Sequence, residues 1–175
     1  MRYLIASDLH GSASSAKFLL EKFNDLKCDK LILLGDILYH GPRNDLPINY
    51  NPKEVISLLN PISSNIIAIN GNCDAEVDQM VLNFQLNKQL DLDLNGIQFH
   101  LEHGHHLDEY DNSSYAILYG HTHIKRIEKI GKNIFLNPGS ITIPKDSKLG
   151  SYMILDNDEL SLFDINSNLL NKVLL

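Results

Sequence analysis

Side chains that can bind a metal ion recur at five places in the sequence, each beside a glycine and each at the end of an expected strand. The carboxyl ends of parallel strands line a common crevice in an α/β sheet, so residues that are distant in the sequence can meet there. Carboxylate, amide and imidazole donors without thiolate suit manganese, iron, zinc, cobalt or nickel better than calcium. The candidate metal ligands are Asp8, His10, Asp36, Asn72, His103, His121 and His123.

Each candidate alone also has an ordinary structural explanation. Asp8 and His10 are two residues apart, so in an extended segment they point to the same side, yet a lone Asp-x-His is a weak signal. Asp36 could cap a helix, Asn72 could hold a turn, and the histidines could lie on the surface. Coincidence at five strand ends is a poor explanation, so we favour a metal site. Seven donors are too many for one tetrahedral ion, and a pair of ions that share the carboxylate of Asp36 fits their number.

The first half of the chain alternates strand-like and helix-like segments. Short apolar runs predict strands over residues 3–7, 30–36 and 65–74. Between them, residues 14–27 carry apolar side chains spaced for one helix face, and residues 51–62 predict a second helix. This order of strands and helices implies a parallel sheet.

The second half is rich in strands. Residues 89–104 alternate on both sides of Asn95-Gly96, the pair that a tight type I′ hairpin prefers. Further short strands are predicted over residues 115–123, 133–140, 151–156 and 160–165. We therefore expect an α/β fold in which two sheets pack face to face with helices outside. Residues 38–52 form one long irregular loop, and a loop of that length in a compact domain is often functional.

Length and composition indicate one domain. The chain has 175 residues and 43% hydrophobic content, so we expect a single domain over residues 1–175. The formal charge is −7, from 22 acidic and 15 basic residues without a basic cluster, which argues against stable nucleic-acid binding. The two cysteines form no disulfide framework, and no apolar run reaches the roughly 18 residues of a membrane span. We expect no leader segment, a cytoplasmic protein with reduced thiols and no membrane partner; the sequence is compatible with a homo-oligomer.

Taken in order, the motifs Asp-x-His, Gly-Asp, Gly-Asn-x-Asp, His-Gly-His and Gly-His-Thr-His resemble the signature of the calcineurin-like metallophosphoesterases. The stretches GDILYHGPRN, GNCDAEVDQM and NPGSITIPK make the chain similar to bacterial phosphodiesterases of that superfamily. The resemblance covers essentially the whole chain. It implies a four-layer α/β/β/α sandwich of two mixed sheets with two divalent ions between them, for which we expect manganese, or else zinc, iron, cobalt or nickel.

The resemblance also implies roles for single residues. It assigns one ion to Asp8, His10, Asp36 and His123, and the other to Asp36, Asn72, His103 and His121. His105 is expected near the site as a candidate catalytic residue rather than a ligand. Residues 137–140, NPGS, are expected to form a structural turn close by, and His106 is assigned to the surface.

Two metal ions can share a water molecule, lower its pKa and hold phosphoryl oxygens for in-line attack. We therefore expect hydrolysis of a phosphate ester by metal-bound hydroxide, without a covalent intermediate. Cys73 stands where many members of the wider superfamily carry a histidine that protonates the leaving oxygen. A thiol with an ordinary pKa of about 8.5 is a poor substitute for that acid, so we interpret Cys73 as a small buried filler.

The long loop contributes two further candidate catalytic residues, His40 and Arg43, which follow Asp36 closely enough to reach a substrate above the metals. The guanidinium of Arg43 offers a planar fork suited to phosphate. A salt bridge within the loop for Arg43, and a turn position for His40, are equally compatible with the sequence. A single cation suits a phosphodiester monoanion better than a monoester dianion, so we expect a small phosphodiester substrate.

Other functions are compatible with the same fold. The small subunit of the retromer coat, a eukaryotic relative of this fold, is an interaction scaffold, but a scaffold does not need all seven donors. A phosphomonoesterase, or a nuclease that acts on long DNA or RNA, would share the site chemistry, and the nuclease would also need a basic surface. We therefore expect a metal-dependent phosphodiesterase.

Overall fold

The computed structural model describes residues 1–107 and 115–175. Two α-helices and two 3₁₀ helices accompany the strands in this part of the chain, and none of its helices is long and apolar enough to span a membrane. The helices are α1 (Ala13–Asp25), α2 (Pro52–Leu59), η1 (Asn60–Asn65) and η2 (Glu76–Met80). The strands are β1 (Arg2–Ala6), β2 (Lys30–Leu33), β3 (Ile66–Ile69), β4 (Leu86–Asn87), β5 (Gln89–Leu94), β6 (Ile97–Glu102), β7 (Ala116–Leu118), β8 (Lys125–Ile130), β9 (Asn133–Pro138), β10 (Ser151–Asp156), β11 (Glu159–Asp164) and β12 (Leu169–Leu174).

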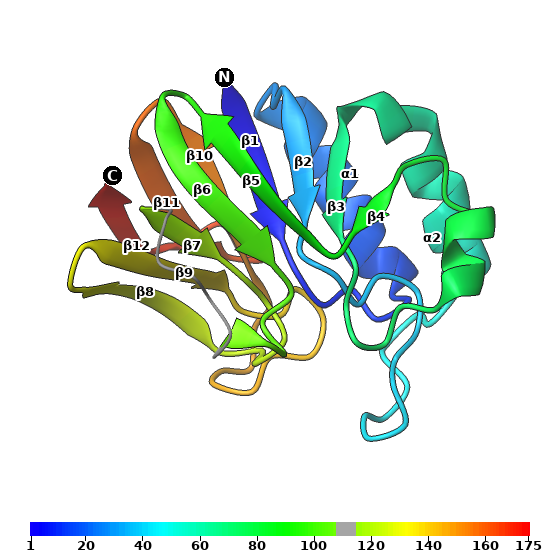
Figure 1. Ribbon diagram of the computed structural model, residues 1–175. Coiled ribbons are helices and arrows are strands. Elements are labelled where there is room, and N and C mark those ends of the chain that lie inside the picture. Colours follow the sequence, from blue (N-terminus) through cyan, green and yellow to red (C-terminus); the bar gives the residue numbers. More distant parts are fainter. Residues whose placement is uncertain (108–114) are drawn as a thin grey trace.

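The strands form two mixed sheets, as expected from the sequence (Figure 1). The seven-stranded sheet has the order β12-β11-β10-β1-β2-β3-β4, and the five-stranded sheet has the order β5-β6-β7-β9-β8. The strands β1 to β4 run parallel, and so do β6, β7 and β9. The remaining neighbours are antiparallel, so the five-stranded sheet has a parallel centre with antiparallel edges. The seven-stranded sheet is parallel from β1 to its edge strand β4 and antiparallel from β1 to its other edge.

The seven-stranded sheet buries both of its faces, because side chains alternate along each strand. Leu4 and Leu33 lie in one core together with the buried faces of α1 and α2. Ile5 and Ile32 lie in the other core, against Phe99 and other side chains of the five-stranded sheet. Helices thus cover the outer face of the seven-stranded sheet, and the five-stranded sheet covers its inner face (Figure 1).

The second helical layer of the predicted sandwich cannot be located in the same way. β6 and β7 are parallel neighbours, and the chain between them contains residues 108–114. The predicted layer lies outside the described residues.

Most elements expected from the sequence are present. The hairpin between β5 and β6 turns at Asn95 and Gly96, both of which have positive φ, as a type I′ turn requires. The edge strands β8 and β12, and the two-residue strand β4, were not expected. β8 is mostly charged and exposed along KRIEKI and β12 is also mostly exposed, so neither shows the pattern of a half-buried strand.

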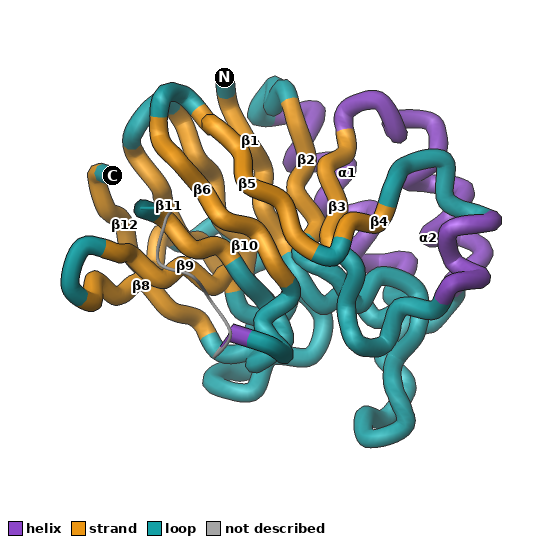
Figure 2. Tube along the Cα trace, viewed as in Figure 1, coloured by secondary structure: helices purple, strands orange, loops and turns teal. Residues whose placement is uncertain are grey.

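The parallel strands that are not at a sheet edge are β1, β2, β3, β6, β7 and β9. They end at one edge of the sandwich, where the loops gather (Figure 2). The loop after β2 and the loop after β9 both lie at this edge, although they come from different sheets (Figure 1). The predicted ligands therefore come together at the carboxyl ends of the parallel strands, where an α/β sheet usually binds its ligands.

Candidate metal centre

Most of the predicted metal ligands have an unusual backbone conformation. Five of the seven have positive φ, a region that non-glycine residues rarely adopt. These residues are Asp8 (φ 59), His10 (φ 50), Asp36 (φ 54), His121 (φ 63) and His123 (φ 59). Strain of this kind costs roughly 1–3 kcal/mol per residue and gathers at functional sites, so its recurrence here supports a common role for these positions.

Two glycines let the strand ends approach each other closely. A Cβ at Gly71 would lie 2.1 Å from Oδ1 of Asp36, and a Cβ at Gly120 would lie 1.9 Å from the hydroxyl of Ser7. Any side chain at these positions would push the carboxylate of Asp36 or the strand end before Asp8 away. The glycines beside the predicted ligands are therefore required for the geometry of the site.

Asp8, His10 and His123 form one compact group at this edge. All three are buried, with exposed fractions of 0%, 0% and 3%. Nε2 of His10 lies 3.2 Å from Nε2 of His123, and Oδ1 of Asp8 lies 3.2 Å from Nε2 of His123. Oδ1 of Asp8 has no hydrogen-bond partner although it is buried. Two facing imidazole nitrogens and an unpaired carboxylate oxygen are a suitable donor set for a divalent cation.

Asp36 lies between two sets of imidazoles. Its Oδ2 is 3.7 Å from Nε2 of His10, and its Oδ1 is 3.5 Å from Nε2 of His103. The amide oxygen of Asn72 lies 3.1 Å from the same nitrogen of His103, and the ring of His121 lies 5.1 Å from the ring of His103. The two oxygens of one carboxylate thus face different histidines, which is the arrangement that a bridging ligand requires.

Three imidazoles are held so that Nε2 points into the cluster. Backbone carbonyl oxygens can only accept hydrogen bonds, so the Nδ1–H groups of His10, His103 and His123 must donate to them. Their acceptors are the carbonyls of Tyr39 at 2.8 Å, Leu34 at 2.6 Å and Ile143 at 2.8 Å. Metal-binding histidines are usually oriented in this way by their second nitrogen.

The protonation of the cluster reflects its negative charge. Burial would raise the pKa of Asp8, but the imidazoles of His10 and His123 close to its carboxylate outweigh burial and hold this pKa below its ordinary range. Burial would lower the pKa of His103, yet the hydrogen bond to Asp36 and the charges of both aspartates raise it to about 9. Nδ1 of His103 faces the carbonyl of Leu34, and Nε2 faces the amide oxygen of Asn72. A proton on Nε2 therefore occupies a position that is suited to a metal cation.

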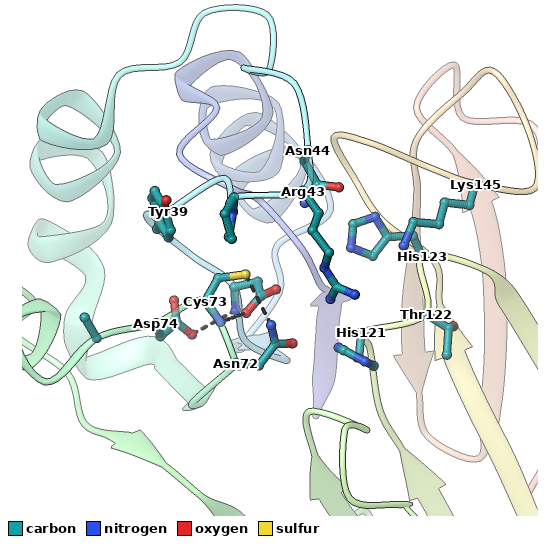
Figure 3. Close-up of a pocket in the computed structure, with 14 residues that line it drawn as sticks. Tyr39, Arg43, Asn44, Asn72, Cys73, Asp74, His121, Thr122, His123 and Lys145 are labelled. Atoms are coloured by element: carbon teal, nitrogen blue, oxygen red, sulfur yellow. Dashed lines mark hydrogen bonds between the residues drawn. The ribbon is translucent and has the colours of Figure 1, made fainter.

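A cavity of about 790 Å³ opens above the cluster (Figure 3). Asp36, Asn72, His121 and His123 line it, together with Arg43 from the loop after β2. The lysines and arginines that form ion pairs in the described part of the chain are Arg2, Lys17, Lys125, Arg126 and Lys172. The alternative of a loop salt bridge for Arg43 is therefore not observed, and its guanidinium faces the cavity (Figure 3).

The other two candidate catalytic residues lie apart from this cavity. The ring of His40 packs edge-on against Tyr39 and Tyr50, and His40 is not among the residues that line the cavity. His105 lines a neighbouring cavity, and its ring lies 6.0 Å from that of His121. His106 beside it is exposed, as predicted.

Cys73 lines the cavity and is only partly buried, which corrects its interpretation as a buried filler. Its sulfur accepts a hydrogen bond from the amide of Asn72 at 3.3 Å, and it lies close enough to His10 and Asp36 to form a potential ligand group with them. Burial, together with the charge of Asp36, raises the pKa of the thiol to about 12. In this structure Cys73 is therefore a neutral thiol.

The NPGS segment, predicted as a structural turn, lies beside the cluster at the end of β9. Asn137 and Pro138 are the last residues of this strand, so the segment is a strand end and not a separate turn. The amide of Asn137 donates to the carbonyl of Gly120 at 2.7 Å. The hydroxyl of Ser140 donates to the carbonyl of Asp8 at 2.9 Å and accepts from the N–H of Ile143. These hydrogen bonds hold the strand ends of both sheets in place.

Asp74 is the most important residue that the sequence analysis missed. Its carboxylate accepts hydrogen bonds from the backbone N–H groups of Asp36 at 2.8 Å, Ile37 at 2.7 Å and Gly71 at 2.7 Å. Burial raises its pKa to about 6, although these hydrogen bonds act in the opposite direction. Asp74 therefore fixes the backbone of Asp36. In the sequence, only its place in the motif Gly-Asn-x-Asp indicated that Asp74 belongs to the site.

Comparisons with known proteins agree with this geometry. A model of the calcineurin-like phosphoesterase superfamily domain matches residues 1–160. Phosphodiesterase YfcE of Escherichia coli (strain K12) is 40% identical over 173 residues, which covers 95% of this chain and 93% of the relative. A solved structure of YfcE, described as a phosphoesterase from E. coli, matches with a TM-score of 0.92 at 37% identity and covers 99% of both chains.

A more distant structural match shows how widely the fold is shared. Wild-type Vps29 of Entamoeba histolytica, solved as a complex with Zn²⁺, has a TM-score of 0.67 and 21% identity, and the match covers 99% of this chain and 98% of Vps29. At that identity the likeness concerns the fold alone.

We predict that Asp74→Asn destabilises the protein and weakens metal binding. An amide offers one acceptor oxygen in place of two, so at least one N–H that Asp74 now satisfies loses its partner, at a cost of about 1–3 kcal/mol in the free energy of unfolding. Urea unfolding of the metal-free protein measures the first effect, and manganese titration by calorimetry measures the second. Asp78→Asn is the matched control, because Asp78 accepts only the N–H of Ala75 near the surface. Equal losses in the two variants would contradict the role given to Asp74.

Proposed function

The chain belongs to the calcineurin-like phosphoesterase superfamily and is a metal-dependent phosphoric ester hydrolase, and from this premise we propose that it hydrolyses small phosphodiesters at a pair of divalent ions. The observation that carries the proposal is the position of Asp36, whose two carboxylate oxygens face His10 and His103 separately. Imidazoles on both sides of this carboxylate offer donors for two ions.

The proposed ligand sets are those that the family resemblance implies. One ion would be held by Asp8, His10, Asp36 and His123, and the other by Asp36, Asn72, His103 and His121. The unpaired oxygen of Asp8 and the facing Nε2 atoms support the first set. The amide oxygen of Asn72 beside Nε2 of His103 supports the second. Oxygen and imidazole donors without thiolate suit manganese, which we propose as the metal, ahead of zinc, iron, cobalt or nickel.

When bound, two such ions would supply a deprotonated water as nucleophile and positive charge for the phosphoryl oxygens. The chain itself supplies orientation. Arg43 faces the cavity without an ion pair among the described residues, and its planar fork can grip the phosphoryl oxygens of a bound ester. The predicted role of His105 would require the leaving oxygen to reach the neighbouring cavity that its ring lines. The predicted role of His40 would require its ring to turn away from Tyr39 and Tyr50 toward the cavity.

Two observations support diesters as the substrate class. Arg43 is the one cation that reaches over the middle of the cluster in Figure 3, and a diester monoanion needs fewer cations than a monoester dianion. The relative that is 40% identical is itself named a phosphodiesterase. We further propose that residues 1–175 form one domain, because both hydrophobic cores are built on the same seven-stranded sheet. We also propose that the protein is cytoplasmic.

We predict that the protein binds two manganese ions per chain and that Asp36→Asn is the most damaging substitution of a single ligand. The change preserves the volume of the side chain but removes the charge shared by both ions, so we expect loss of both ions and loss of turnover. Elemental analysis after manganese loading and gel filtration measures the stoichiometry. Saturation at one ion per chain, or near-normal turnover of the variant, would overturn the dinuclear site.

We predict a preference for phosphodiesters over phosphomonoesters with the same aryl leaving group. The test compares kcat/KM for matched mono- and diesters with metal-free protein to which single metals are added back. Arg43→Ala should raise KM more than it lowers kcat, because a grip on the phosphoryl oxygens acts in the ground state and the transition state alike. A higher kcat/KM for the monoesters would contradict the proposed substrate class, and unchanged kinetics of the variant would remove Arg43 from the site.

We predict that Cys73→His helps substrates with poor leaving groups most. A neutral thiol protonates a departing alkoxide poorly, whereas general acid catalysis typically contributes about 10²- to 10⁴-fold. The measurement is the dependence of rate on leaving-group pKa at equal metal occupancy, with Cys73→Ala as the control that removes the thiol without adding an imidazole. A flatter dependence in Cys73→His alone supports a missing acid. The same slope in all three proteins would mean that another group already donates the proton.

A further inference from the structure

A second cation faces the cavity from the wall opposite Arg43. Lys145 lies in the loop after β9, whereas Arg43 lies in the loop after β2, and both line the cavity. In Figure 3 the guanidinium of Arg43 points toward Asn72 and His121, while Lys145 enters beside His123. The two positive charges therefore serve different parts of the cavity.

The backbone of Lys145 is tied to one of the candidate ligands. Its N–H donates to the carbonyl of His123 at 3.0 Å, and the carbonyl of Ile143 accepts from Nδ1 of the same histidine at 2.8 Å. His123 thus holds the segment from both sides. A shift of the backbone at Lys145 relative to the cluster would break one of these hydrogen bonds, so the fold holds the base of this side chain at the cavity.

The ammonium group of Lys145 is not neutralised within the described part of the chain. The acidic residue next to it, Asp146, is engaged by Lys125, whose Nζ lies 2.6 Å from Oδ1 and whose backbone N–H also donates to the same carboxylate. Among the ion pairs of the described residues none includes Lys145. An exposed lysine whose neighbouring carboxylate is already occupied is available to an anionic ligand.

The size of the cavity shows where such a ligand would fit. At about 790 Å³ the cavity is within the range of sites that hold molecules much larger than a phosphate group. The scissile phosphate would occupy the part above the cluster that Arg43 faces, and an ester substituent would fill the part that extends toward Lys145.

We propose that Lys145 binds a second anionic group, a terminal phosphate on one ester substituent of the diester, and so selects diesters that carry one. This inference rests on the proposed function and names the substrate class more narrowly. An ammonium ion pairs with a phosphate dianion more strongly than with a neutral substituent, so the lysine discriminates between diesters that react by the same chemistry.

The test uses two substrates that differ only in the distant charge. One is a p-nitrophenyl diester with an alkyl chain, and the other carries an uncleavable phosphonate at the end of the same chain. Release of p-nitrophenolate by the manganese-loaded enzyme gives kcat/KM for each. We expect the wild-type enzyme to prefer the phosphonate diester, and the preference to fall about tenfold in Lys145→Met, which keeps the apolar stem but removes the charge. Lys145→Arg should restore most of it.

Lys148→Met is the matched control, because Lys148 is exposed in the same loop but does not line the cavity. Its preference should equal that of the wild type, and thermal unfolding checks that all variants are folded. Equal loss on both substrates in Lys145→Met would overturn the proposal and place the lysine on the scissile phosphate, and no loss on either would also overturn it. If the wild type binds both diesters in calorimetry but cleaves neither, the proposed function fails. The ratio of the two affinities in Lys145→Met, compared with that in the wild type, then still decides the role of Lys145.

Discussion

The negative charge of two buried carboxylates is the constraint on which the rest of the site depends. Asp8 and Asp36 are exposed by 0% and 2%, and each offers an oxygen within 4.8 Å of the other and of an imidazole nitrogen of His103. Two like charges at this separation cannot both remain ionised in a buried site unless positive charge lies between them. The carboxylates of Asp8 and Asp36 raise the pKa of His103, so they favour positive charge at this position. Metal binding would supply that charge.

The fold maintains this unfavourable arrangement at several points at once. The carboxylate of Asp74 holds the backbone at Asp36, and the hydroxyl of Ser140 holds the carbonyl of Asp8. Gly71 and Gly120 allow the neighbouring strand ends to lie against these residues. Positive φ at Asp8 and Asp36 adds backbone strain, which the parallel strands on either side, buried on both faces, are well placed to support. The ligands are thus prepared by the scaffold before any ion binds.

The sequence indicated which side chains gather at the strand ends better than it indicated the residues that support them. A ligand such as Asp36 follows a buried apolar strand and a glycine, and this pattern is local and can be read directly. Asp74 acts on a backbone segment 38 residues away, and nothing near it in the sequence indicates that contact. Lys145 is a single lysine in a loop, and only the arrangement of two sheets places it opposite Arg43. The edge strands β8 and β12 were missed because exposed, charged residues hide the alternation of a strand.

The division between sheets and loops explains how one fold can serve different functions. Vps29 shares the fold at 21% identity, so the two sheets tolerate extensive change in sequence. The cavity is lined by the loops after β2, β3, β7 and β9, which are not strands of either sheet. A change in these loops alters the charge and shape that a substrate meets and leaves the strand ends that hold the ligands in place. Because Arg43 and Lys145 lie in different loops, the two roles proposed for them, binding of the scissile phosphate and selection of its substituent, can change independently.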